Sequence, residues 1–462
     1  MAQFEIKDGV AIIPDGTTEI EWGAFRNCSS LESVTIPNSV TEIGGYAFDS
    51  CTSLKSITIP NSVTYIGDNT FRDCRSLKSI IIPESITRIA ENAFYGCSEL
   101  ESVVIPNSVT EIGKNTFRAC FSLKSITIPK SVTKIGALAF NVCTSLESIV
   151  IPESVTKIDD GAFSACKSLK SITIPESVKA IGEGAFSGCS SLKSITIPGS
   201  VGTIRYQTFA RCTSLEDVVM SKGVKKIGYE AFEGCTSLKS ISVPMSVKEI
   251  DDNAFVNCTS LESIVLPKVK KIGHSAFDGC TSLESIRIVD SATKISPRAF
   301  RGCISLKNIT IPNSVTEISA NAFEGCTSLE SIAIPNSVTY IGDGAFRGCT
   351  SLKSITIPES VKRIGKSAFE GCTSLESITI PKLVTEIGEN TFIGCASLTS
   401  ITLPESLVWI SKSTFFYDRN GTYLVLTAIN VPVVKADFYK KRLPEELHDK
   451  IVELAPEKNT QK

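Results

Sequence analysis

The sequence predicts a solenoid made mostly of β-strands and irregular turns with few helices, and three observations predict it. All 17 cysteines recur every 23 residues, except between Cys258 and Cys280, where the spacing is 22. A phenylalanine column keeps the same register over 18 positions, from Phe25 to Phe415. In each copy, apolar residues alternate with small polar residues just before a proline. A fixed period of this length indicates stacked rungs, each of which buries its apolar side only when a neighbour covers it.

A typical rung, residues 349–371, shows what each position contributes. Its first apolar residues follow the spacing L-x-x-I-x-I, and the last two alternate with Ser and Thr, which is typical of a short strand. Pro358 removes a backbone donor and ends this strand. Val361 and Ile364 turn a second apolar face inward, and Gly365 permits the bend. Burying the phenylalanine that closes the rung contributes about 1.5–3 kcal/mol, so this column is expected to dominate the stability.

The pattern C-x-x-L-x-x-I-x-I-P-x-x-V-x-x-I-x-x-x-A-F resembles the Treponema-type, BspA-like leucine-rich repeats over residues 10 to about 417. The resemblance implies a leucine-rich-repeat superhelix with a parallel β-sheet on its concave face. It also implies a surface protein, because members of the family occur mostly on bacterial or protist surfaces, where they bind host proteins and mediate adhesion.

The repeat register divides the chain into three predicted parts. Residues 1–27 form an N-terminal cap and incomplete first repeat, with Asp8 at the leucine position and Trp22 covering the next turn. Residues 28–417 form the leucine-rich-repeat solenoid of about 17 repeats, and residues 418–462 form a C-terminal capping segment. The polar substitutions and large aromatic residue of the first part suit a cap, because its outer face meets water.

The capping segment departs from the repeat. Asp418 and Gly421 stand at the cysteine and leucine positions. Leu424 and Leu426 are expected in a last ladder element, and residues 443–454 are a candidate for a short helix. Three aromatic residues are expected as apolar padding under this cap: Trp409, Phe416 and Tyr417.

The cysteines form a column with one thiol in each rung. Side chains in such a column point the same way, whereas a disulfide needs Cβ atoms that converge. We therefore expect free, buried thiols that act as small apolar fillers. The alternatives are paired disulfides or metal ligation, although the sequence has neither a CxxC motif nor a histidine near the cysteines.

Composition and motifs exclude several function classes. The formal net charge of -2 argues against a dedicated nucleic-acid binder, and no run of about 18 apolar residues predicts a membrane span. Phe4, Glu5 and Asp8 stand where a signal peptide needs an apolar run, so either the protein stays inside the cell or a leader has been removed. The two histidines, His274 and His448, are many rungs apart. We therefore expect no catalytic residues, no metal, no cofactor and no enzyme activity.

The outward positions of the predicted strand form two columns of small residues. One is a serine column broken only by Asp217 and Asn308, and the other is rich in threonine. Either they suit a flat sheet through their strand propensity, or they form a binding surface. Beside them the sign of charge alternates, as in Glu147 and Lys170, which predicts ion pairs between rungs that fix register and solubility.

Between residues 199 and 297 the repeat becomes irregular and basic. Arg287 stands where threonine is usual, and lysines precede the second-face isoleucine of several rungs. The candidate partner-binding residues are Lys225, Lys226, Lys248, Lys270, Lys271, Arg287 and Lys294. One interpretation is a docking site for an acidic partner or sulfated glycan, and the other is a solvated flank whose partners are Glu249 and Asp251.

The function that the sequence favours is a non-enzymatic protein-binding or adhesion scaffold. The resemblance implies a cell-surface or secreted location and a protein ligand on a host or partner cell, or an acidic glycan. We expect a monomer that binds no nucleic acid and spans no membrane. The alternative is an intracellular, cytoplasmic structural or protein-interaction platform.

Overall fold

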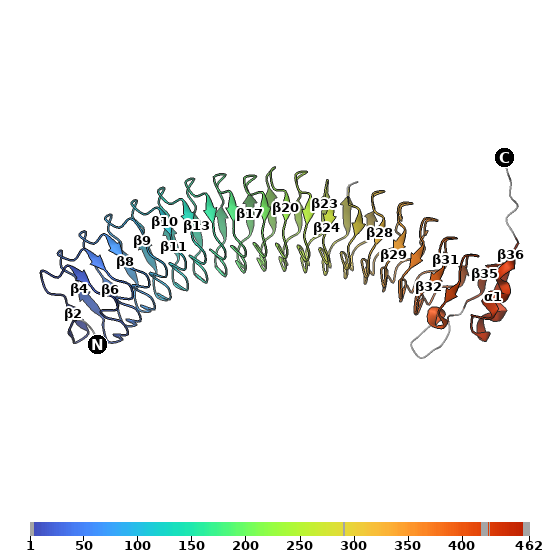
Figure 1. Cartoon of the computed structure of the whole chain (residues 1–462), viewed down its shortest axis with the longest axis horizontal. Helices are drawn as coiled ribbons and strands as arrows, with labels where there is room; N and C mark the ends of the chain where they lie inside the picture. Colours follow the sequence, from blue (N-terminus) through green and yellow to red (C-terminus); the bar gives the residue numbers. More distant parts are fainter. Residues whose placement is uncertain (1–3, 290–291, 417–423, 425, 456–462) are drawn as a thin grey trace. The chain divides into compact units, whose positions relative to one another are not determined.

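The structure is a computed structural model that describes residues 4–289, 292–416, 424 and 426–455 (Figure 1). The chain divides into two compact units, Met1–Leu238 and Lys239–Lys462. Each unit is a stack of rungs, and each typical rung contributes one strand to a first sheet and a two-residue strand to a second sheet. Asp418, Gly421, Tyr417 and the last residues of the chain lie outside the described residues.

The first unit begins with a hairpin and continues as two parallel ladders. Strand β1 (Ile6–Lys7) pairs antiparallel with β2, and Asp8 lies in the turn between them. The first-sheet strands are β2 (Val10–Ile12), β4 (Ser33–Thr35), β6 (Ser56–Ile57), β8 (Ser79–Ile81), β9 (Ser102–Val104), β11 (Ser125–Thr127), β13 (Ser148–Val150), β15 (Ser171–Thr173), β17 (Ser194–Ile197) and β19 (Asp217–Met220). The second-sheet strands are β3 (Glu19–Ile20), β5 (Glu42–Ile43), β7 (Tyr65–Ile66), β10 (Glu111–Ile112), β12 (Lys134–Ile135), β14 (Lys157–Ile158), β16 (Ala180–Ile181), β18 (Thr203–Ile204) and β20 (Lys226–Ile227).

The second unit has the same two ladders and holds the chain's helices. Its first-sheet strands are β21 (Ser240–Ser242), β23 (Ser263–Leu266), β25 (Ser285–Ile288), β27 (Asn308–Thr310), β31 (Ser377–Thr379), β33 (Ser400–Thr402), β35 (Ala428–Pro432) and β36 (Ile451–Leu454). Its second-sheet strands are β22 (Glu249–Ile250), β24 (Lys271–Ile272), β26 (Lys294–Ile295), β28 (Glu317–Ile318), β29 (Tyr340–Ile341), β30 (Arg363–Ile364), β32 (Glu386–Ile387) and β34 (Trp409–Ile410). The described helices are short: η1 (Lys412–Phe415), η2 (Val433–Lys435), α1 (Ala436–Lys440) and η3 (Glu445–Lys450).

The parallel register follows the sequence period. Ser125 pairs with Ser148, 23 residues later, and Ser148 with Ser171. In the rung that is one residue short, Ser263 pairs with Ser285. The deletion falls in the turn between Pro267 and Val269, so both ladders keep their alignment across it. The solenoid prediction is therefore confirmed, and the placement of the first sheet on a concave face stays a prediction.

The phenylalanine column forms a continuous stack inside each unit. In the first unit, neighbouring ring centroids from Phe25 to Phe232 lie 5.2–5.5 Å apart. In the second unit, the spacing runs from 5.3 Å between Phe255 and Phe277 to 6.1 Å between Phe392 and Phe415. All these rings are fully buried. Nearly parallel rings at this distance combine area burial with aromatic contact, so the column holds each rung on the next.

The cysteines are free thiols, which confirms that prediction. Sixteen are buried, and Cys28 is half-buried. Buried thiols along the column also donate to the carbonyl of the phenylalanine 25 or 26 residues earlier in the chain, as from Cys51 Sγ to Phe25 O at 3.1 Å and from Cys280 Sγ to Phe255 O at 3.2 Å. Burial raises the pKa of the thiols, that of Cys143 to about 12. The thiols therefore link rungs by hydrogen bonds as well as filling space.

The turn before the phenylalanine differs from the expected one. Gly365 does not supply a left-handed conformation; the residue that does is Ser367, at a φ of 53°. Gly365 is needed for close approach, because a Cβ atom there would lie 2.4 Å from the backbone nitrogen of Asp343. The bend is therefore made two residues later, at a position that Asn and Gly also occupy in other rungs.

The end of the chain corrects three predictions. Leu424 and Leu426 are buried but lie outside any strand, and β35 pairs with β33 instead. Residues 443–454 form the 3-10 helix η3 and then strand β36, which pairs with β35. Trp409 is not padding, because 44% of it is exposed.

A buried tyrosine supplies the packing that was expected of the aromatic residues near the end. Tyr439 of α1 is fully buried, and its hydroxyl donates to Pro404 O at 2.5 Å. At the other end of the chain, Trp22 is 63% exposed and lies 5.4 Å from the ring of Tyr46. The predicted boundaries at residues 27 and 417 stay predictions.

Candidate functional site

The outward face of the first sheet in the second unit carries the candidate site. In β25, Ile286 and Ile288 point into the core, whereas Ser285 and Arg287 point outward and are exposed. This alternation follows from the two-residue period of a strand, so the outward residues of successive rungs lie in columns. A side chain in one of these columns is held by the ladder but faces solvent.

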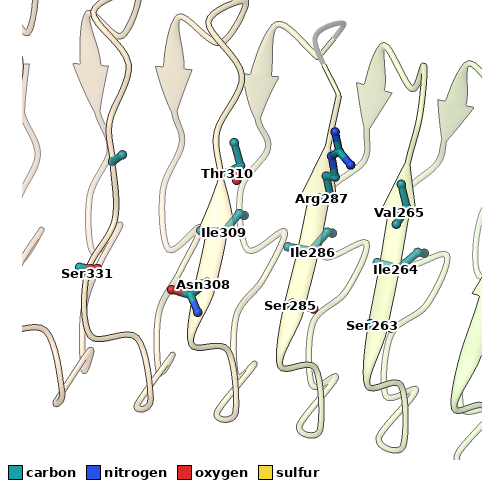
Figure 2. Close-up of a pocket in the computed structure, with 11 residues that line it drawn as sticks. Ser263, Ile264, Val265, Ser285, Ile286, Arg287, Asn308, Ile309, Thr310 and Ser331 are labelled. Atoms are coloured by element: carbon teal, nitrogen blue, oxygen red, sulfur yellow. The ribbon is translucent and has the colours of Figure 1, made fainter.

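A shallow hollow of about 440 Å³ lies on this face (Figure 2). It extends over four rungs, and its outward lining residues are Ser263, Val265, Ser285, Arg287, Asn308, Thr310, Ser331 and Ala333. Nearly all of these side chains are small and neutral. The hollow therefore offers hydroxyl and amide groups around a single charge.

Arg287 is that charge, and it is unusual in the sequence. Its column has 18 positions from Ile12 to Thr402, and Arg287 is the sole charged residue among them. Figure 2 shows its guanidinium extending past Ile286 toward the end of β25, beside Thr310 and Val265. Within the described part of the chain the guanidinium has no hydrogen bond or ion pair. Its donors are free to meet a ligand.

The charges next to the hollow compensate one another. Lys307 Nζ lies 3.2 Å from Glu284 Oε2, so this pair adds no net charge. Asn308 is paired in register with Ser285, one rung away and two residues before Arg287. The hollow therefore holds one uncompensated cation and one exposed amide at separate points along the strand direction.

The six lysines of the predicted basic site lie elsewhere. Lys225 and Lys226 belong to the first unit, next to and within β20. In the second unit the backbone nitrogen of Lys270 donates to the carbonyl of Lys248 at 2.7 Å, so these two lie on neighbouring rungs. Lys271 and Lys294 begin the second-sheet strands β24 and β26.

Acidic residues accompany these lysines on the second sheet. Lys271 Nζ lies 3.6 Å from Asp251 Oδ1, and Lys271 is paired in register with Glu249. Lys294 is paired in register with Glu317. Glu249 and Asp251 are thus placed as the solvated-flank interpretation requires.

Within the second unit, the structure divides the predicted residues between the two sheets. Lys248, Lys270, Lys271 and Lys294 follow the second sheet, whereas Arg287 stands on the outward face of the first. The sequence did not predict which residues lie near Arg287 in the hollow. The main one is Asn308, which in the sequence is only a break in the serine column. The available signal was that both columns depart from their usual residue in adjacent rungs.

Two further hollows lack an unpaired charge. One, of about 460 Å³, lies in the first unit on the same kind of face and is lined by neutral residues that include Ser56, Thr58 and Ile81. The other, of about 390 Å³, contains Arg347, whose guanidinium lies 3.4 Å from Glu370 Oε1 and 3.7 Å from Glu324 Oε1. Of the three hollows, the one around Arg287 has the clearest chemical preference.

Neither a metal site nor a membrane-spanning helix is found among the residues that the structure describes. No group of three or more His, Cys, Asp or Glu side chains there could hold a metal ion. No helix in that part is long and apolar enough to cross a bilayer.

The similarity of this chain to known proteins extends over its repeats. The family profile "BspA type Leucine rich repeat region (6 copies)" matches residues 18–147, 133–262, 203–330, 248–373 and 316–441. A leucine-rich repeat protein from Bacteroides ovatus ATCC 8483 is similar in structure, with a TM-score of 0.56, 28% identity, and coverage of 96% of this chain and 94% of that chain. No curated protein matches the chain.

Two other solved structures have higher identity and lower structural similarity. A leucine rich cell surface protein from Faecalibacterium prausnitzii A2-165 is 30% identical, with a TM-score of 0.40 and coverage of 77% of this chain and 87% of that one. The T. pallidum leucine-rich repeat protein is 30% identical, with a TM-score of 0.33 and coverage of 40% and 78%. The family profile matches well over half of the sequence, and the register of cysteines and phenylalanines matches the rungs of the structure. The chain belongs to the BspA-type leucine-rich repeat family.

Proposed function

We propose that the protein is a non-enzymatic binding scaffold at the cell surface or outside the cell, where it attaches to proteins of a host or partner cell. Leucine-rich repeat proteins are in general protein-interaction scaffolds, and membership of the BspA-type family supports the surface location. The observation that carries the proposal is the outward face of the first sheet in the second unit. There Arg287 lies in a shallow hollow, and its guanidinium has no ion pair or hydrogen bond with any described residue.

This face suits attachment to another macromolecule better than chemistry on a small substrate. The hollow is shallow, and its outward lining consists of Ser, Thr, Val and Ala side chains around Arg287 and Asn308. A ladder of rungs holds these groups rigidly, so a partner that contacts several rungs meets a surface that is already ordered. Repetition along the stack also allows several weak contacts to add up.

A direct binding assay tests the proposal. The biotinylated chain would be applied to an array of purified extracellular-matrix and cell-surface proteins, with saturable binding as the readout. We expect at least one protein to bind. We expect that binding to fall at least fivefold when Arg287→Thr, Asn308→Ser and Ala333→Thr restore the common residues of the columns.

The matched control changes the first unit in the same way. Ile81→Thr and Val104→Thr also restore a common column residue, and they should leave the binding unchanged. Absence of saturable binding to every protein on the array would contradict the proposed function. Equal loss in both variants would contradict the placement of the site in the second unit.

A second candidate is an intracellular interaction platform, and the thiols favour it. All 17 cysteines are free, and free thiols are the rule in reducing compartments. Burial protects 16 of them, and it raises the pKa of thiols such as that of Cys143, so the column is also compatible with an oxidising exterior. Fractionation of the source cells followed by immunoblotting separates the two candidates, because only the first predicts protein outside the cytoplasm.

A further inference from the structure

We propose that the hollow around Arg287 binds an extended peptide segment of the partner, with the Arg287 guanidinium holding a carboxylate side chain and the Asn308 amide pairing with a peptide group. This inference rests on the proposed function and names the ligand of its site. On this inference the hollow is a specific site for an acidic peptide and not a surface for nonspecific binding.

The first step concerns the sign of the ligand. A guanidinium presents five donors and no acceptor, and its planar fork matches the two oxygens of a carboxylate. Arg287 has no carboxylate partner among the described residues, whereas the nearby Lys307 has Glu284 at 3.2 Å. Burying this guanidinium under an apolar partner would leave its donors unsatisfied. The bound partner therefore has to supply an acceptor, and a carboxylate supplies the best match.

The second step concerns the number of charges. Arg287 is the sole charged residue that lines the hollow, and the nearby Lys307 is compensated by Glu284. A sulfated glycan carries several closely spaced anions and gains affinity from clusters of cations, which this face lacks. One carboxylate fits the single charge that is present, and a further anion would find no second uncompensated cation in the hollow.

The third step concerns the shape of the ligand. The described lining contains no aromatic ring on which a sugar could stack. Asn308 offers both a donor and an acceptor, as a peptide group does. In register it stands opposite Ser285, two residues before Arg287, which is about 6.6 Å along a strand at roughly 3.3 Å per residue. An extended peptide has the same rise, so a carboxylate at one residue places a peptide group near Asn308 two residues away.

Fluorescence anisotropy with two blocked peptides tests the inference. The probes are fluorescein-labelled Ser-Val-Thr-Glu-Ser-Val-Ser with an amidated end, and the same peptide with Gln in place of Glu. At low ionic strength we expect the Glu peptide to bind at least fivefold more tightly than the Gln peptide. The preference should disappear in Arg287→Thr, and it should shrink in Arg287→Lys, which keeps the charge and loses the fork.

Two controls keep the result interpretable. Arg287→Thr places the common residue of the column, and an unchanged circular dichroism spectrum and unfolding midpoint would show that the variant folds. Lys294→Thr removes a cation on the other sheet, and it should leave the Glu preference intact. A heparin-derived hexasaccharide serves as the competing anionic probe and should bind no better to the native chain than to Arg287→Thr.

The outcomes separate this inference from the proposed function. Equal affinity for the two peptides, a Glu preference that survives Arg287→Thr, or Arg287-dependent binding of the hexasaccharide alone would overturn the inference. Binding to a protein on the array that is insensitive to Arg287→Thr would uphold the scaffold function and reject the acidic-peptide site. A Glu preference that depends on Arg287, without any protein bound on the array, would uphold the site and reject the proposed partners.

Discussion

The outward faces of the first sheet in the two units share one backbone and differ in chemistry. In the first unit the hollow beside Thr58 and Ile81 is neutral, and Ile81 is 73% exposed. In the second unit the equivalent column carries Arg287, with Asn308 in the next rung. Both faces keep the same parallel register. The ladder therefore leaves its outward columns free to vary, because folding depends on the residues that point inward.

The interior of the two units is nearly uniform. Stacked phenylalanine rings and thiols bonded to carbonyl oxygens recur in both, as in Cys143 to Phe117 O at 3.0 Å and Cys326 to Phe300 O at 3.2 Å. Changes to the interior should therefore affect the two units alike, and changes to the outward face should affect only the unit that carries them. Each of the following experiments tests one side of this contrast.

Alkaline pH should produce the largest effect, and it should act on both units. Burial raises the pKa of Cys143 and of Cys395 to about 12, whereas an unfolded thiol titrates near about 8.5. Because the folded pKa is the higher one, the stability that each buried thiol adds is complete below about pH 8.5 and is lost as the pH rises toward 12.

The loss is up to about 1.4 kcal/mol per pH unit for each such thiol, summed over many rungs. We expect cooperative loss of the far-ultraviolet circular dichroism signal between about pH 9 and 12. A chain with Cys143→Ala and Cys166→Ala should lose less of its own neutral-pH stability over this range. Retention of the native spectrum at pH 12 would contradict the role given to burial of the thiols.

Truncation of one stacked ring should be the next largest effect. Phe94→Ala in the first unit and Phe323→Ala in the second each remove a fully buried ring that lies 5.5 Å from both of its neighbours. We expect each to lower the free energy of unfolding by about 3–5 kcal/mol, measured by urea denaturation. Similar losses would show that the interior is shared. A loss confined to one unit would show that the two interiors differ in ways that their geometry does not reveal.

Transplanting the two distinctive residues should have a smaller effect, and on binding alone. Ile81→Arg with Ser102→Asn gives the first unit the same pair of positions that Arg287 and Asn308 occupy in the second. In a chain that also carries Arg287→Thr, we expect the preference for the Glu peptide to return to within about fivefold of the native value. Anisotropy measures it, and Ile81→Arg alone is the control. Failure to restore any preference would mean that the surroundings of Arg287 contribute more than its column position.

The exposed ion pairs should matter least. Lys55 and Glu32 pair across rungs at 2.6 Å in the first unit, as Lys307 and Glu284 do at 3.2 Å in the second. Because both pairs are solvent-exposed, Lys55→Gln and Lys307→Gln should each change the free energy of unfolding by about 0.5 kcal/mol or less. Lys307→Gln should in addition weaken Glu-peptide binding about twofold, since it leaves Glu284 uncompensated beside the hollow. An equal change from Lys55→Gln would argue against this local effect.

The period of the sequence predicted the rungs but not the hydrogen bonds between them. The spacing of Cys and Phe located every rung, because a repeated burial pattern has one solution in a stack. It could not show that a thiol such as that of Cys51 donates to Phe25 O, since spacing says nothing about the direction of an S–H bond. Prediction failed where the period stops. No repeat defines a register for Leu424, Leu426 and residues 443–454, so tertiary contacts determine their structure.

The candidate site was predictable only in part for a related reason. The sequence marked Arg287 as an exception in its column, and the lysines as a run of positive charge. Which of these shares a face with Arg287 depends on the path of the chain between the two sheets, because Lys294 follows it by seven residues yet belongs to the other ladder. Asn308, 21 residues away in sequence, is the closer companion because its rung is the next one in the stack.

The thiols that link the rungs have a consequence for biosynthesis. Once stacked, each sulfur from Cys51 onward is sealed from solvent, but an unfolded polypeptide would present all 17 to any oxidant at once. Random pairing among so many identical neighbours would trap the chain in mismatched crosslinks. Translation and stacking therefore have to be completed under reducing conditions, or export has to be followed by closure of the stack faster than sulfur chemistry can intervene.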